Sequence, residues 1–489
     1  MVFNSFFFIF IFMPLVTAGW YLLNKKSATA AEWFLIVMGL WFYGSFGVWY
    51  LVILVLSVLF NYGTGSLLRK RNKGVLAAGI AVNLFFMCWF KYVTPALVSG
   101  AEAGWLQASQ RTMDFLSVGL PIGFSFYTFS QISYLVDSYQ GTITRDGFRR
   151  YVLYLTYFPK IIEGPITCYE EIAMQFRDAS KRRFHAENFA RGLILFVFGL
   201  AKKLLIADVL AGAATFGIQS AWYLDTLSGV LTMSCYALQL YYDFSGYCDM
   251  AMGLSAMLGI GLPLNFNAPF QAKSFPEFWK RWHMTLTRFF TRYVYIPLGG
   301  SRRGKLRTAG NVMVVFLLSA LWHGLGTTYL IWGLLSGAFV AAGGLLTNLL
   351  PQKMFGKVFG KVKVYLLFLF TLVFFAAPSA EYSMVILKNL FRPLYPGWLY
   401  RMAAKLDVPE FWVINKAVGA AAPSLQNPVL LLELVIIVAV ALVLTQKKTA
   451  AELAAQVRLT GKDAALIGLL LVLCLCSMSG VSTYLYFKF

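Results

Sequence analysis

Long apolar runs separated by short polar connections dominate the pattern of residues along this chain. Most runs approach about 20 residues, the length at which an α-helix crosses the hydrocarbon core of a bilayer. The candidate membrane helices lie at residues 1–23, 33–62, 75–98, 117–137, 151–167, 189–206, 209–224, 226–260, 309–349, 363–386, 428–445 and 464–480. Residues 33–62 favour two crossings, and 309–349 predict a helical hairpin. The pattern predicts an all-α polytopic membrane protein with about eleven or twelve transmembrane helices.

Basic residues between the runs predict how the chain crosses the membrane, because Lys and Arg collect in cytoplasmic loops. Lys25 and Lys26 follow the first run, and four basic residues lie within 447–462, between the last two runs. We therefore expect a retained first span and extracytoplasmic N- and C-termini, with residues 481–489 forming an outward-facing tail. No repeat or linker divides the pattern, so we expect a single membrane domain over residues 1–489.

The composition agrees with a membrane protein and weakens other interpretations of the charge. Hydrophobic residues make up 59% of the 489 residues and charged residues only 13%, whereas about a quarter of a soluble protein is charged. The net charge is +21. Retention of Lys and Arg in cytoplasmic loops is the commoner source of such an excess, so we expect no nucleic-acid partner. The six cysteines have no metal-knuckle spacing.

The longest polar interruption, residues 272–307, holds nine Lys or Arg and one acid. Ser274, followed by Pro276 and Glu277, has the spacing of a capping box at a helix start. Aromatic and cationic side chains then fall on separate arcs, which predicts an interfacial or re-entrant amphipathic helix. Such a face binds phosphates, either of anionic lipid headgroups or of a ligand such as a coenzyme A thioester. The candidate donor-binding residues are Lys280, Arg281, Arg302 and Arg303.

Three histidines and two acids are the candidates for chemistry. His323 lies well inside an apolar run, where an ionisable residue normally faces a protein interior or a cavity, although a structural hydrogen bond is the alternative. His283 lies at the edge of the aromatic arc and suits a catalytic or an interfacial role equally. His185 lies in a polar connection and is expected to be solvated. The histidines are too scattered to predict a metal site.

Asp243 and Asp249 also lie inside an apolar run, with Ser245 one helical turn before Asp249. These residues suit an orienting or structural role. A proton or cation pathway of a transporter would use the same acids.

These residues belong to motifs that resemble the membrane-bound O-acyltransferase (MBOAT) family, specifically its bacterial AlgI-like branch of alginate O-acetylation proteins. The similar segments are MVFNSFFFIFIF, LPIGFSFYTFSQISYLVDSYQG, FPKIIEGPI, GLAKKLLIAD, YYDFSGYCDMAMGLS, RWHMTLTRFFTRYVYIPLGGSRRGK and LLSALWHGLGTTYLIWG. The resemblance implies a ring of helices around a thinned centre. It places His323 at the family's membrane-embedded catalytic histidine and His283 at its second, more variable position.

The resemblance also implies an O-acyltransferase of the bacterial cytoplasmic (inner) membrane with no bound cofactor. Acetyl-CoA or another acyl thioester is the expected donor, and the expected partners are an extracytoplasmic acetyltransferase and a polysaccharide acceptor. The tail VSTYLYFKF looks like the aromatic tails of surface-acylation systems, which makes Tyr486 a candidate acyl relay, or alternatively an interfacial anchor. A Dlt-like transferase using a carrier-protein thioester and a transporter or flippase remain as alternative functions.

Overall fold

The computed structural model describes residues 1–105, 109, 113, 119–143, 147–346, 357–393, 396–406, 408, 411–478 and 484–485. All regular elements in these ranges are helices, which confirms the all-α prediction. The chain divides into two compact units, which we call unit 1 (Met1–Phe196 and Met250–Leu264) and unit 2 (Val197–Asp249 and Asn265–Phe489). Helix α12 (Thr226–Met257) contributes residues to both. The expectation of a single membrane domain stays a prediction.

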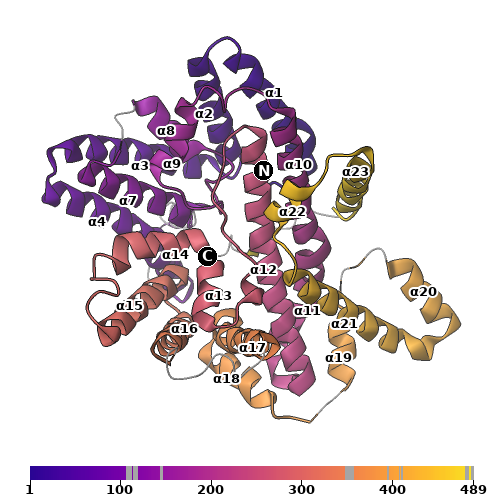
Figure 1. Ribbon diagram of the computed structural model, residues 1–489. Coiled ribbons are helices and arrows are strands. Elements are labelled where there is room, and N and C mark those ends of the chain that lie inside the picture. Colours follow the sequence, from indigo (N-terminus) through magenta and orange to yellow (C-terminus); the bar gives the residue numbers. More distant parts are fainter. Residues whose placement is uncertain are drawn as a thin grey trace. The chain divides into compact units, whose positions relative to one another are not determined.

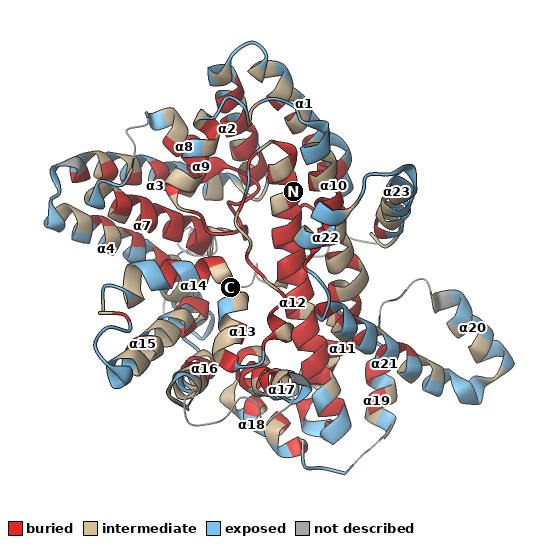
Figure 2. Ribbon diagram, in the orientation of Figure 1, coloured by how far each residue is buried: buried red, intermediate tan, exposed pale blue. Residues whose placement is uncertain are grey.

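Unit 1 consists mainly of helices from the N-terminal part of the chain. Its helices are α1 (Met13–Asn24), α2 (Ala28–Gly44), α3 (Val48–Leu67), α4 (Lys73–Cys88), α5 (Thr94–Glu102), α7 (Phe124–Gln140), α8 (Phe148–Thr156), α9 (Tyr169–Arg177) and most of α10 (Ala186–Ala201). Helix α7 packs against α3 and α4 (Figure 1) and is buried along most of its length (Figure 2). The run at 33–62 splits into α2 and α3, as expected, at Gly47.

Unit 2 carries the remaining elements, among them a helical hairpin. Besides the unit's part of α12, its helices are α11 (Asp208–Gln219), α13 (Phe275–Arg281), α14 (Met284–Phe290), α15 (Lys305–His323), α16 (Thr327–Leu346), α17 (Lys357–Ala376), α18 (Ala380–Asn389), α19 (Pro396–Ala403), α20 (Trp412–Ala421), α21 (Gln426–Thr445), α22 (Ala450–Gln456) and α23 (Gly461–Cys476). Helices α15 and α16 lie side by side (Figure 1), which confirms the hairpin predicted at 309–349.

Six helical segments in the described part of the chain are long and apolar enough to cross a membrane. They are Val48–Leu67, Lys73–Glu102, Lys305–His323, Thr327–Leu345, Val358–Ala376 and Pro423–Thr445. Their outer faces are apolar: α21, for example, exposes Leu432, Val435, Ile436 and Val440. Apolar side chains on the outside are stable against lipid and unfavourable against water. Other expected spans coincide with shorter or more polar helices, so the total of eleven or twelve crossings stays a prediction.

Candidate active site

A cavity of about 330 Å³ lies within unit 2, among α13, α14, α15, α16 and α17. Its walls are mostly apolar and include Trp279, Phe290, Phe316, Trp332 and Phe375. His283 and His323 both line it, although they are 40 positions apart in the sequence. A mostly apolar cavity of this volume with a few polar groups is typical of a small-molecule site.

His323 is the last residue of α15 and is almost completely buried, with 6% of its surface exposed. Its ring centroid lies 4.6 Å from that of Trp322, 4.9 Å from that of Phe375 and 5.3 Å from that of Trp332. These aromatic neighbours restrict the orientation of the imidazole. The carbonyl end of α15 carries the negative pole of the helix dipole, which stabilises a histidine cation by about 0.3–1 kcal/mol at exposed sites and more when partly buried.

His283 lies between two short helices, so the single amphipathic helix expected through this stretch is wrong. Helix α13 ends at Arg281, and α14 begins at Met284 after His283, whose φ of 45° is left-handed. The backbone N–H groups of Met284 and Thr285 donate to Asn265 instead of to helix carbonyls. This competing partner from a distant part of the chain, which helical periodicity cannot register, breaks the helix.

The helix start before His283 agrees with the sequence prediction in part. Ser274 Oγ accepts a hydrogen bond from the Glu277 N–H, as in a capping box, but the Glu277 carboxylate accepts from the N–H of Lys273.

Burial lowers the pKa of His283 to about 3, so its imidazole is neutral at physiological pH.

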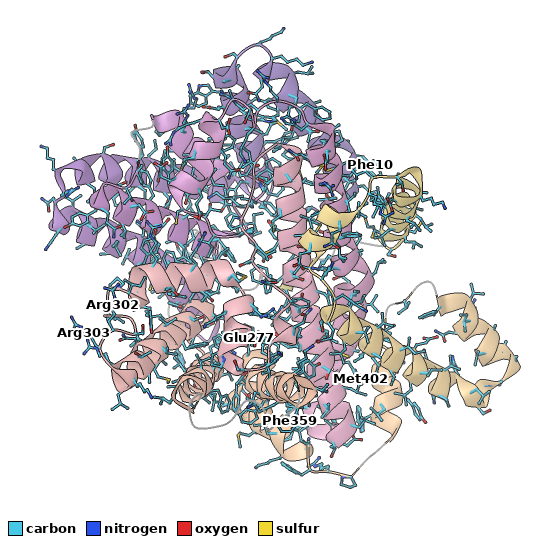
Figure 3. All side chains as sticks on the ribbon, in the orientation of Figure 1. Phe10, Glu277, Arg302, Arg303, Phe359 and Met402 are labelled. Carbon is cyan, nitrogen blue, oxygen red and sulfur yellow. The ribbon has the colours of Figure 1, made fainter. Side chains whose placement is uncertain are left out.

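The four predicted donor-binding residues are not gathered in one place. Lys280 lines the cavity. Arg281 forms an ion pair with Glu277, with an Nη2 to Oε1 distance of 2.8 Å. Arg302 and Arg303 are exposed in the connection before α15, where their side chains extend away from the ribbon (Figure 3).

The buried acids have lysine partners that the sequence analysis missed. Asp243 binds Lys203, with an Oδ1 to Nζ distance of 2.7 Å, and Asp249 and Ser245 both contact Lys202. These acids and Ser245 are not among the residues that line the cavity. Two adjacent lysines inside the apolar run 189–206 were a usable signal, because a buried ammonium group needs an anionic partner.

The C-terminal tail reaches the ion pair of Asp243 and Lys203. The backbone N–H of Leu485 donates to Asp243 Oδ2 at 2.7 Å. Tyr484 is fully buried, and the Nζ of Lys203 lies 4.7 Å from the centre of its ring. Tyr486, the predicted acyl relay, lies outside the described residues.

His185, the remaining histidine, is exposed in unit 1, as expected. Its Nε2 lies 3.3 Å from the carbonyl oxygen of Ser180. Within the described ranges, no group of three or more His, Cys, Asp or Glu side chains is arranged to hold a metal ion.

Comparison with known proteins identifies the family. The sequence profile of the membrane-bound O-acyltransferase family matches residues 71–387, a range that includes both cavity histidines. A peptidoglycan O-acetyltransferase of Helicobacter pylori is 34% identical over 80% of this chain and 80% of that protein. A probable alginate O-acetylase AlgI of Pseudomonas putida is 35% identical over 78% of each chain. A teichoic acid D-alanyltransferase of Bacillus subtilis is 29% identical over 44% of this chain and 56% of that protein. The chain therefore belongs to the membrane-bound O-acyltransferase family and is a multi-pass membrane enzyme of the O-acyltransferase class.

Proposed function

We propose that this enzyme takes an acetyl group from a cytoplasmic thioester, with acetyl-CoA as the donor, and delivers it for O-acetylation of an extracytoplasmic polysaccharide. The observation that carries the proposal is the apolar cavity of about 330 Å³ lined by both His283 and His323. The proposed location is the bacterial cytoplasmic membrane, with both termini on the outer side. An extracytoplasmic acetyltransferase is the proposed partner that passes the group to the polymer.

His323 is the proposed general base. Its imidazole takes the proton of the acceptor hydroxyl while the hydroxyl oxygen attacks the thioester carbonyl. The tetrahedral intermediate then collapses, the carbon–sulfur bond breaks, and the departing thiolate takes the proton back from the imidazolium. The carbonyl end of α15 stabilises the transient imidazolium, and the apolar walls exclude water as a competing acceptor.

Lys280 is the proposed contact for the phosphates of the donor, because it is the cationic residue among those that line the cavity. Ammonium groups bind phosphate as point charges. Arg302 and Arg303 are exposed, and their proposed role is to attract the anionic donor electrostatically before it enters the cavity.

Tyr486 is proposed as the first acceptor, its phenol oxygen forming an acetyl ester that the partner transferase then consumes. The tail residue just before it, Leu485, donates its backbone N–H to Asp243 Oδ2. The acyl-tyrosine should be visible by mass spectrometry after incubation with acetyl-CoA. Tyr484→Phe, which keeps the buried ring, is the control for Tyr486→Phe. Normal transfer by Tyr486→Phe without any acyl-tyrosine in the wild type would refute the relay.

The main experiment measures free thiol released from acetyl-CoA by protein purified into lipid nanodiscs. His323→Ala should lose about 10²- to 10⁴-fold of the rate, the usual effect of a general base. His185→Ala, which removes the exposed histidine, is the matched control and should retain the rate. Undiminished release by a folded His323→Ala protein would contradict the proposed base. Release only from an acylated carrier protein, and not from acetyl-CoA, would indicate the donor used by the Dlt-like alternative.

A further inference from the structure

Asn265 is at the centre of the hydrogen bonds that hold the His283 turn. Its side-chain oxygen Oδ1 lies 3.1 Å from His283 Nδ1, 3.2 Å from the backbone N of Thr285 and 2.9 Å from Thr285 Oγ1. Its backbone carbonyl accepts from the N–H of Met284 at 2.8 Å. Asn265 is 1% exposed and His283 4% exposed, so water is largely excluded from these bonds.

The backbone N–H of Thr285 determines which atom of the Asn265 amide faces the turn. A backbone N–H can only donate, so the side-chain atom opposite it has to be the amide oxygen. That oxygen has no hydrogen, so it can only accept from His283 Nδ1. The Nδ1 atom of His283 therefore carries the proton, and Nε2 is the nitrogen with the lone pair.

The same bonds stabilise an unfavourable backbone at His283. His283 is a non-glycine residue in the left-handed region, which is a strained backbone conformation. The groups of His283, Met284 and Thr285 together make four hydrogen bonds to Asn265, three of them to its side-chain oxygen. These bonds offset the strain of the turn, and three of the four need the Asn265 side chain.

We propose that Asn265 is a positioning residue that holds His283 in its Nδ1–H tautomer and in the left-handed turn between α13 and α14. The Nε2 of His283 is thereby kept as a basic nitrogen. Any part of this role in acyl transfer rests on the proposed function, since His283 lines the proposed reaction cavity. The tautomer itself does not rest on it.

Nitrogen-15 NMR of protein labelled at histidine identifies the tautomer directly, because it shows which ring nitrogen is protonated. Because the chain has only three histidines, His185→Gln with His323→Gln leaves His283 as the single reporter. Its spectrum should show a protonated Nδ1 and an unprotonated Nε2. A protonated Nε2 in this folded protein would overturn the proposal.

Three substitutions in this single-histidine background separate the role of Asn265 from general packing. Asn265→Ala should make the Nε2–H form the major signal, and Asn265→Asp, which keeps an oxygen acceptor, should retain Nδ1–H. Thr285→Val removes a neighbouring hydrogen bond to the same oxygen and should leave the Nδ1–H form in place. An Asn265→Ala spectrum identical to that of its parent would refute the proposal. If Asn265→Ala does not fold, the parent and Asn265→Asp spectra still decide the question.

Acetyl transfer is then measured in the full three-histidine protein. A carboxylate beside Nδ1–H stabilises the imidazolium of His283. In Asn265→Asp, the loss of rate on the acid side of the pH–rate profile should therefore begin at a higher pH than in the wild type. If the spectra show the expected tautomer and Asn265→Ala transfers acetyl at the wild-type rate, the proposed catalytic role of His283 fails while the assignment of Asn265 stands.

Discussion

The contact between α15 and α16 offers a sharp test of how far the cavity geometry controls activity. Gly333 of α16 faces α15 at Ala320 and Phe316, which lie about one and two turns before His323. A Cβ atom at Gly333 would lie 2.6 Å from the Ala320 Cβ and 2.9 Å from the Phe316 carbonyl oxygen. These distances fall short of the ordinary minimum of 3.4 Å by 0.8 and 0.5 Å. Gly333→Ala therefore requires the two helices to separate locally by a similar amount.

Separation of the helices should reduce activity because Trp332, the neighbour of Gly333, packs against His323 with ring centroids 5.3 Å apart. A misplacement of about 1 Å can reduce a rate about 100-fold, so we expect kcat/KM for thiol release to fall by about 10- to 100-fold. Overpacking should also reduce stability by roughly 1–3 kcal/mol. The assays are acetyl-CoA turnover in nanodiscs and the midpoint of thermal unfolding.

Gly344→Ala is the matched control on the same helix. An added Cβ at Gly344 meets no atom within 4 Å, and alanine is favoured over glycine in a helix by about 0.5–1 kcal/mol. This variant should keep its activity and be at least as stable as the wild type. Equal activity of Gly333→Ala and Gly344→Ala would refute the argument that close packing of α15 and α16 positions His323.

Three further predictions concern charge. Lys203→Met should destabilise the folded protein by about 3–5 kcal/mol in thermal unfolding, because it leaves the buried Asp243 without its cation. Adding Asp243→Asn should recover part of this lost stability. Because the pKa of His283 is depressed in the folded protein, the unfolded chain binds more protons below pH ~6.5, and the free energy of unfolding should decrease as the pH drops from there towards about 3. His283→Gln should flatten this pH dependence, and an unchanged dependence would contradict a neutral buried imidazole. Lys280→Gln should raise the KM for acetyl-CoA more than Arg303→Gln, and a larger effect of Arg303→Gln would place the donor outside the cavity.

The helical elements were predictable where local pattern decides them. The hairpin of α15 and α16 and the division of residues 33–62 into α2 and α3 follow from the lengths of the apolar runs and the basic residues between them. The break at His283 was not predictable, because the periodicity of aromatic residues continues through it. Asn265, which causes the break, is 18 positions away along the chain and carries no motif that would have singled it out.

The candidate site also has features that the local sequence predicts and features that only the tertiary structure decides. The pattern of runs and buried charges was sufficient to predict a membrane protein and to select His323, since an ionisable group in an apolar run requires an unusual environment. The resemblance of motifs implied a role for His283, which the pattern alone had left open, and added the acyltransferase chemistry. The pairing of Asp243 with Lys203, the position of Lys280 at the cavity and the Asn265 hydrogen bonds were decided only by tertiary structure. Hydrophobic periodicity is a local property of the chain, whereas ion pairs, cavities and tautomers depend on which distant residues folding brings within hydrogen-bonding distance.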